Sequence, residues 1–218
     1  MAKKIGVLLS GCGVYDGSEI HEAVLTLLFL DRSGAEVVCL APDMDQVHAI
    51  NHLTQQPETT PRKVLVEAAR IARGEIRDLA AVSADDLDAL ILPGGFGAAK
   101  NLCDFALVGP DASVQPQVAD LLSGLHAQGK PIGAMCIAPA VVARTLGSVA
   151  PQVTIGNDVG TAAGIEAMGA RHVNCAVDEI CVDADHRVVT TPAYMLGPGI
   201  ADIAKGIEKL VAQVLAWA

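Results

Sequence analysis

The chain has 218 residues, a length that allows one domain to bury its own core. Apolar residues make up 51% and charged residues 18% of it, which excludes an intrinsically disordered protein, because disorder needs low hydrophobicity and high charge. The 25 acidic residues outnumber the 15 basic ones, so the formal net charge is −10, and neither nucleic acid nor an anionic membrane is an expected partner.

Short apolar runs alternate with helical patterns along the chain. The first half is expected to contain, in order, a strand at 5–9, a helix from a Ser18 cap to about Ser33, a strand at 36–40, a polar loop at 42–61, a helix at 62–73 and a strand at 87–92. Gly34 is expected to end the first helix, because glycine readily adopts the left-handed conformation found after helix ends.

The second half continues the alternation. It is expected to contain a helix at 114–127, a strand at 131–135 followed at once by a helix to about Leu146, short strands at 153–155, 172–173 and 188–190, and a closing helix from Gly199. Strands that are continuous apolar runs are typical of sheets buried on both faces. The sequence therefore predicts an α/β fold, a doubly wound and mostly parallel sheet sandwiched by helices, in a single domain over residues 1–218.

Cys136 is the first candidate for chemistry. Ligands of open α/β sheets bind beyond the carboxyl ends of the strands, and Cys136 directly follows the strand at 131–135. Small residues two positions to either side, Ala134 and Ala138, allow the sharp strand-to-helix turn that presents a nucleophile. N–H groups at a helix start would favour the thiolate. The alternative interpretation is a buried structural cysteine.

Two further segments follow strands. Gly94 and Gly95 expose backbone N–H groups that could bind an oxyanion beside Cys136, although an ordinary glycine turn is the alternative. Glu19 and Glu22 lie three residues apart, so they share one face of the first helix, and either could act as a general acid/base. The alternative for both glutamates is stabilisation of the helix dipole.

Cofactor and metal sites are not expected. Residues 11–17 read G-x-G-x-x-x-G, close to a dinucleotide-binding pattern, but the helix there begins too late for that motif. His48 and His52 have helical spacing without a third ligand nearby, which argues against zinc.

The six cysteines include no C-x-x-C pair, which favours a reduced, cytoplasmic protein. Residues 190–194 follow the last apolar strand and are a candidate pocket wall.

The order of these segments resembles the ThiJ/PfpI superfamily, a branch of the class I glutamine amidotransferase-like fold. Within it, the chain resembles the glyoxalases associated with isoprenoid biosynthesis in four segments: S-G-C-G-V-Y-D-G-S-E-I-H-E, P-G-G-F-G-A-A-K-N-L, K-P-I-G-A-M-C-I-A-P and V-V-T-T-P-A-Y. The resemblance implies a flavodoxin-like sandwich, a nucleophilic Cys136, an oxyanion site made by the backbone of Gly95 and Ile137, and a glutamate in contact with the thiol. Counting back from Gly34 selects Glu22, while the long first loop keeps Glu19 as a second candidate.

The activity implied by the resemblance is that of a glutathione-independent, cofactor-independent glyoxalase. It would convert glyoxal, or methylglyoxal, to the 2-hydroxy acid through a hemithioacetal on Cys136, in a homodimer. Ile137 and Gly156 stand where superfamily hydrolases place a histidine, which disfavours peptidase and glutaminase activity because amide cleavage needs an acid for the leaving nitrogen. The alternative is a non-catalytic redox-sensing or regulatory protein of isoprenoid metabolism that uses the same cysteine.

Overall fold

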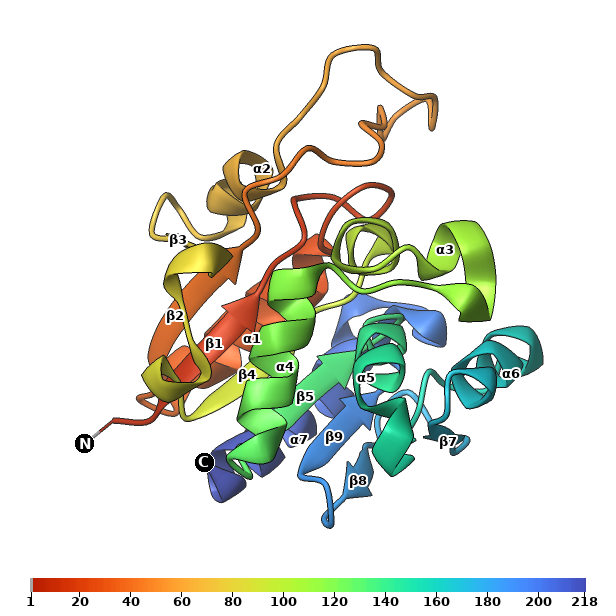
Figure 1. Ribbon diagram of the computed structural model, residues 1–218. Helices are drawn as coiled ribbons and strands as arrows, with labels where there is room; N and C mark the ends of the chain where they lie inside the picture. Colours follow the sequence, from red (N-terminus) through yellow and green to blue (C-terminus); the bar gives the residue numbers. More distant parts are fainter. Residues whose placement is uncertain (1) are drawn as a thin grey trace.

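A twisted sheet of seven strands forms the centre of the protein in the computed structural model, which describes residues 2–218 (Figure 1). The strand order is β3-β2-β1-β4-β5-β9-β8, and every neighbouring pair is parallel except β8 and β9. The strands are β1 (Lys4–Leu8), β2 (Glu36–Ala41), β3 (Arg77–Asp78), β4 (Ala89–Leu92), β5 (Ile132–Met135), β8 (Cys181–Asp183) and β9 (Val188–Thr191). The expected doubly wound α/β fold is therefore confirmed.

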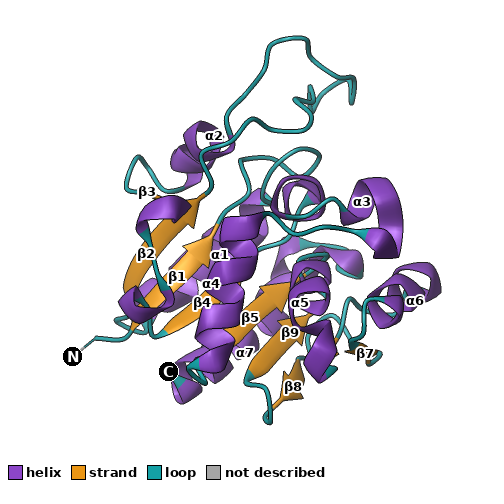
Figure 2. Cartoon of the chain, viewed as in Figure 1, coloured by secondary structure: helices purple, strands orange, loops and turns teal. Residues whose placement is uncertain are grey.

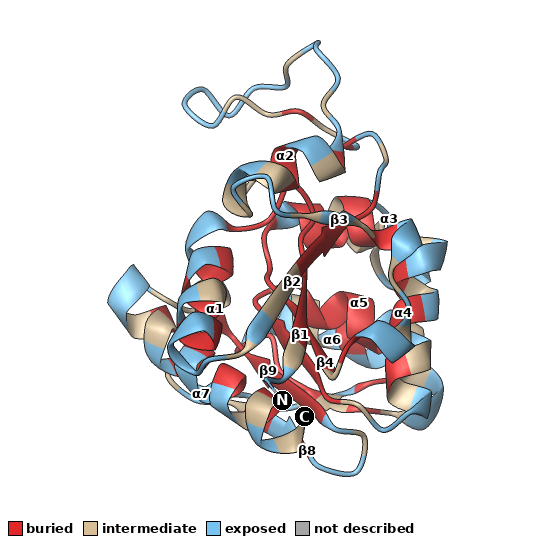
Figure 3. Cartoon of the chain, turned by 90° about the vertical axis from the view of Figure 1, so that its left-hand side faces the viewer, coloured by how far each residue is buried: buried red, intermediate tan, exposed pale blue. Residues whose placement is uncertain are grey.

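Helices cover both faces of this sheet, as the side view shows (Figure 3). One face carries α1 (Ile20–Arg32), α2 (Val64–Ile71) and α7 (Ile200–Trp217), and the other carries α4 (Pro116–Ala127) and α5 (Pro139–Leu146), with α6 (Val159–Ala167) and α3 (Phe105–Val108) beside them. Among the described residues, no helix combines the length and the apolar character that crossing a membrane would require.

The core is divided into two apolar layers by the sheet. Leu90, Leu122 and Val142 belong to the layer under α4 and α5, whereas Ile5 and Ile207 belong to the layer under α1 and α7. Strands β4 and β5 are buried along their whole length, which explains their continuous apolar sequences. Lys3 Nζ donates to the carbonyl of Ala218, so the two ends of the described chain lie together.

Residues 150–173 depart from the expected pattern. The short strands β6 (Gln152–Val153) and β7 (Arg171–His172) form a separate parallel pair instead of joining the main sheet. Two hydrogen bonds attach this pair to the main sheet: Thr154 N–H donates to Thr190 Oγ1 (2.8 Å) and Gln152 N–H donates to Asp183 Oδ2 (2.6 Å).

The start of α1 also differs from the expectation. Glu19, not Ser18, caps this helix: its Oε2 accepts a hydrogen bond from the Glu22 N–H at 2.7 Å. Ser18 Oγ instead accepts from the Ser10 N–H at 2.8 Å, which closes the turn after β1. The helix ends at Arg32, and Gly34 follows with a φ of 70°, as expected of a helix-terminating glycine.

The polar segment 42–61 is a long loop, seen at the top of Figure 2. It is attached to the turn after β1 by two buried side chains. Asp16 Oδ2 accepts from the Ile50 N–H (2.7 Å), and Asn101 Oδ1 accepts from the Val47 N–H (3.0 Å). Asn101 also donates to the carbonyls of Ser10 and Asp16, so this loop and the turn are held as one layer beyond the sheet's carboxyl edge.

Candidate functional site

The carboxyl ends of β1, β4, β5 and β9 bring the predicted site residues together. Leu92 pairs with Ala134, and Met135 pairs with Thr191, so the segments that follow these strands meet at one edge. A cavity of about 290 Å³ opens there, lined by Val14, Glu19, Gly95, Phe96, Cys136, Ile137, Thr161, Tyr194 and Met195. Position after a parallel strand thus predicted which residues converge at this edge of the sheet.

Cys136 sits at a strained turn directly after β5. Its φ is 59°, a left-handed conformation that is uncommon for a residue with a side chain. The Cys136 N–H donates to the Thr191 carbonyl at 3.0 Å, and α5 begins only at Pro139, three positions later than the sequence indicated. Ala134 and Ala138 on either side are fully buried, so the small residues serve the turn as expected.

Glu22 is the glutamate in contact with this cysteine. Its side chain is 0% exposed, and its carboxyl forms a hydrogen bond with the Cys136 thiol. Oε2 accepts from the Gly94 N–H (2.8 Å) and Oε1 accepts from the Tyr194 N–H (3.2 Å). Burial, followed by the nearby Glu19 carboxylate, raises the pKa of Glu22 to about 8. The Glu22 carboxyl is therefore mostly protonated at neutral pH.

Glu19 also lines the cavity, but it has a different structural part. Its Oε2 is bound to the Glu22 N–H, and its own N–H donates to the Gly94 carbonyl at 2.9 Å. The first bond caps α1, and the second fixes its first turn against the glycine turn after β4. The structure therefore separates the two glutamates that the sequence left as alternatives: Glu22 touches the sulfur, and Glu19 holds Glu22 in place.

The backbone around the sulfur supplies hydrogen-bond donors. The N–H groups of Gly95 and Ile137 are directed at Cys136 Sγ, as the family resemblance implied. Gly94 differs from the expectation, because its N–H is bound to Glu22 and is not free for an oxyanion. Burial and a charged Glu22 raise the pKa of Cys136 well above its ordinary value, while the two N–H groups act in the opposite direction.

We expect Gly94→Ala to disrupt this arrangement. An added Cβ would lie 2.4 Å from Cys136 Cβ and 2.8 Å from Glu22 Oε2. Overpacking of this kind costs about 1–3 kcal/mol, which lowers the Tm by roughly 2–12 °C in a protein of this size. Gly199→Ala is the control, because the Cβ there meets nothing closer than 3.8 Å. Equal melting temperatures for the two variants would contradict the close packing at Gly94.

One hydrogen bond at the cavity was not foreseen. His21 Nδ1 lies 2.7 Å from the hydroxyl of Tyr194, which lines the cavity. Residues 190–194 were identified as a candidate wall, and Tyr194 confirms that placement. The role of His21 was missed because its partner lies 173 positions away in sequence. Its position between Glu19 and Glu22, in the first turn of α1, was the available signal.

The glycines after β1 do not form an open phosphate-binding turn. A Cβ on Gly17 would lie 2.2 Å from Cys12 N, and one on Gly95 would lie 2.4 Å from the Gly17 carbonyl oxygen. Gly17 and Gly95 thus allow the loop after β1 and the loop after β4 to pack closely. This packing explains the G-x-G-x-x-x-G pattern at residues 11–17 without a dinucleotide. Within residues 2–218, no group of three or more His, Cys, Asp or Glu side chains is arranged to hold a metal ion.

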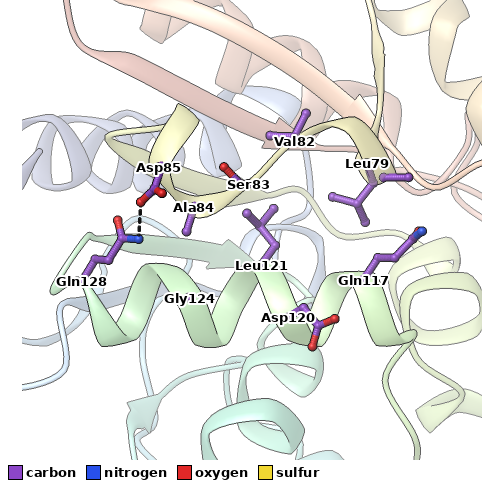
Figure 4. A pocket seen from close by; sticks show the side chains of 11 residues that line it. Leu79, Val82, Ser83, Ala84, Asp85, Gln117, Asp120, Leu121, Gly124 and Gln128 are labelled. Carbon is purple, nitrogen blue, oxygen red and sulfur yellow. Dashed lines mark hydrogen bonds between the residues drawn. The ribbon is translucent and has the colours of Figure 1, made fainter.

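A larger cavity of about 430 Å³ lies between α4 and the segment before β4 (Figure 4). Its walls include Leu79, Leu121 and Asp120, and Gln128 Nε2 donates to Asp85 Oδ1 across it at 2.7 Å. The residues that line it include no cysteine or histidine. The smaller cavity at Cys136 is therefore the candidate active site.

Comparison with known proteins gives the family. No family model matches the chain. It is 49% identical to the human "glutamine amidotransferase-like class 1 domain-containing protein 3, mitochondrial", over 98% of this chain and 83% of the relative. It is 46% identical to the rat "ES1 protein homolog, mitochondrial", over 97% of this chain and 83% of the relative.

Solved structures agree with this result. A structure of an isoprenoid biosynthesis protein with an amidotransferase-like domain, from Ehrlichia chaffeensis, is 34% identical over 99% of this chain and 100% of that chain, with a TM-score of 0.92. DJ-1beta of Drosophila melanogaster covers 100% of both chains at 21% identity and a TM-score of 0.57, which shows a shared fold. With such identity over nearly its whole length, the chain belongs to the family of glutamine amidotransferase-like class 1 domain proteins that includes the ES1 proteins.

Proposed function

We propose that the protein is a cofactor-independent glyoxalase that converts glyoxal, or methylglyoxal, to the 2-hydroxy acid. The observation that carries this proposal is the contact between the Cys136 thiol and the buried Glu22 carboxyl, whose pKa is raised to about 8. A thiol can add to an aldehyde, and a carboxyl with a pKa near neutrality can both donate and accept a proton. Isomerisation of a dicarbonyl needs no other group.

The first step of the proposed reaction is addition. In the reactive form the Cys136–Glu22 pair has lost one proton to solvent, which leaves a thiolate beside the neutral Glu22 carboxyl. The sulfur of Cys136 attacks one aldehyde carbon, a C–S bond forms, and the carbonyl electron pair moves to oxygen. Glu22 gives its proton to that oxygen, which yields a hemithioacetal and leaves Glu22 as a carboxylate. The N–H groups of Gly95 and Ile137, which point at the sulfur, stabilise the developing oxyanion next to it.

The second step moves a proton between the two carbons. The Glu22 carboxylate removes the hydrogen of the hemithioacetal carbon, and the electron pair forms an enediolate with the second carbonyl. The hydroxyl proton of the first carbon passes to the oxygen of the second, and Glu22 returns its own proton to the second carbon, which leaves a thioester bearing a hydroxymethyl group. Water then displaces the thiol and releases glycolate. One carbon is oxidised and its neighbour is reduced, so no external oxidant or reductant is needed.

Incubation of the purified protein with glyoxal, without glutathione, tests the proposal. We expect catalytic formation of glycolate, detected by NMR, and deuterium at its CH₂ carbon when the reaction runs in D₂O, because Glu22 exchanges its proton with solvent. Cys12→Ser is a control expected to retain activity, since Cys12 is half-buried in the turn after β1 and does not line the cavity. Persistence of glyoxal would refute the proposal and favour the redox-sensing or regulatory alternative.

The cellular setting of this activity is also a proposal. The six cysteines are free thiols, which suits any reducing compartment. We keep the cytoplasm as the proposed location, although the human and rat relatives are named as mitochondrial. The expected homodimer likewise stays a proposal, as does the absence of nucleic acid and membrane partners.

A further inference from the structure

We propose that this site favours a neutral 2-oxoaldehyde that carries an apolar substituent over glyoxal itself. The inference rests on the proposed function and adds the substrate class. It is carried by three properties of the cavity at Cys136: its volume, the chemistry of its walls and the sign of its charge.

The volume exceeds what a two-carbon dialdehyde needs. At about 290 Å³, the cavity lies near the lower end of the range of pockets that bury drug-sized ligands. Glyoxal bound to Cys136 would leave most of this space to water. A substrate whose carbonyl pair is joined to a ring or a branched chain would fill it.

The walls suit such a group. Val14, Phe96, Ile137 and Met195 present apolar side chains to the cavity. The Phe96 side chain is 46% exposed, so an apolar ligand would remove water from it. The unbranched thioether of Met195 can adapt to substituents of different shape.

The Phe96 ring is already held in position. Its backbone N–H donates to the Val14 carbonyl at 2.8 Å, which joins two walls of the cavity. The Lys100 ammonium lies 4.9 Å from the ring centroid and donates to the Tyr15 carbonyl at 3.3 Å. A preordered aromatic wall loses little conformational freedom when a ligand binds.

The charge of the cavity disfavours anionic substrates. Glu19 is the one acidic residue among those that line the cavity. The lining residues include no lysine, arginine or histidine. A carboxylate or phosphate on the substituent would enter a largely apolar site, beside Glu19 and with no cation among the residues that line it, since the Lys100 ammonium is bound to the Tyr15 carbonyl. The favoured substituent is therefore neutral as well as apolar.

Comparison of substrates across matched variants tests this inference. We expect Phe96→Ala to lower kcat/KM for phenylglyoxal by a factor at least about tenfold larger than the factor by which it lowers kcat/KM for glyoxal, because only the ring substituent loses its contact. The ratio of variant to wild type for each substrate cancels differences in intrinsic reactivity and hydration. Leu107→Ala, which removes a side chain of similar exposure (48%) outside the cavity, should change neither value.

A second comparison of substrates tests the expected exclusion of anionic substituents. With wild-type protein, 4-carboxyphenylglyoxal should react at least about tenfold more slowly than phenylglyoxal, measured as kcat/KM. Equal values for this pair, or an equal effect of Phe96→Ala on glyoxal and phenylglyoxal, would overturn the inference while leaving the glyoxalase proposal intact. Failure of the wild type to consume any of these aldehydes would overturn both.

Discussion

Replacement of Cys136 by serine should lower glyoxal consumption at least about 1,000-fold, the loss expected when a nucleophile is removed from a catalytic unit. A serine hydroxyl is far less acidic than a thiol, and Glu22 is mostly protonated at neutral pH, so it cannot serve as a strong base for that hydroxyl. The measurement is the initial rate of glyoxal loss and of glycolate formation by the purified variant.

The fold should survive this change. Serine is similar in size to cysteine, and the bond from the backbone N–H at position 136 to the Thr191 carbonyl does not involve the side chain. We therefore expect the Tm of Cys136→Ser to stay close to that of wild type, as should the Tm of the Cys12→Ser control. A folded Cys136→Ser protein with substantial activity would show that another residue is the nucleophile.

Glu22→Gln should reduce turnover at least about 100-fold, because an amide cannot move the proton between the two substrate carbons. Glu19→Gln should cost clearly less. Its side chain still offers an oxygen to the Glu22 N–H, and Glu19 does not touch the sulfur. Steady-state kinetics of both variants side by side decide the assignment. A nearly inactive Glu19→Gln beside an active Glu22→Gln would reverse it.

The pH profile gives an independent check on the same pair. The reactive form of the Cys136–Glu22 pair has lost one proton. The site then holds either a thiolate beside a neutral carboxyl or a carboxylate beside a thiol, and the two forms share one macroscopic pKa. Since the pKa of Glu22 is raised to about 8, kcat/KM of the wild type should rise with pH and level off above about 8. In Glu22→Gln this rise should be lost or displaced to higher pH.

Glu22 should also make stability depend on pH. Its pKa is raised from an ordinary value of 4.5 to about 8 by folding, so the folded state holds the proton more tightly than the unfolded state. The resulting stabilisation is complete below about pH 4.5 and is lost as pH rises to about 8, by about 1.4 kcal/mol for each pH unit between. Glutamine does not titrate, so the Tm of wild type should fall relative to that of Glu22→Gln from pH 5 to pH 8. Parallel curves would contradict this.

The parts of the fold with strong periodic patterns were predictable. The buried strands β1, β4 and β5 and the amphipathic helices α4 and α7 all lie where apolar runs or stripes indicated them. Short elements without such a pattern were missed. Helix α6 buries only Ile165 and depends on its Asp158 cap, while β3 and β8 consist of two and three residues.

The site was predictable as far as it follows from chain order. Cys136, Gly95 and Glu22 come after strands or begin a helix, so their convergence follows from the topology of a parallel sheet. The count back from Gly34 favoured Glu22 over Glu19, and the contact with Cys136 agrees with it, although the orientation of that helical turn does not follow from the sequence pattern itself. The contact of His21 with Tyr194 depends on the packing of α1 beside the turn after β9, which is set only by the whole core.

The position of β9 has a consequence for biosynthesis. This strand lies beside β5, its Thr191 carbonyl holds the backbone of Cys136, and the following Tyr194 N–H binds Glu22, 172 positions earlier in the chain. A nascent chain that has emerged only as far as α6 lacks both bonds. The thiol and the carboxyl can therefore be fixed against each other only after β9 and Tyr194 have been synthesised, because contacts of such long sequence separation form late in folding.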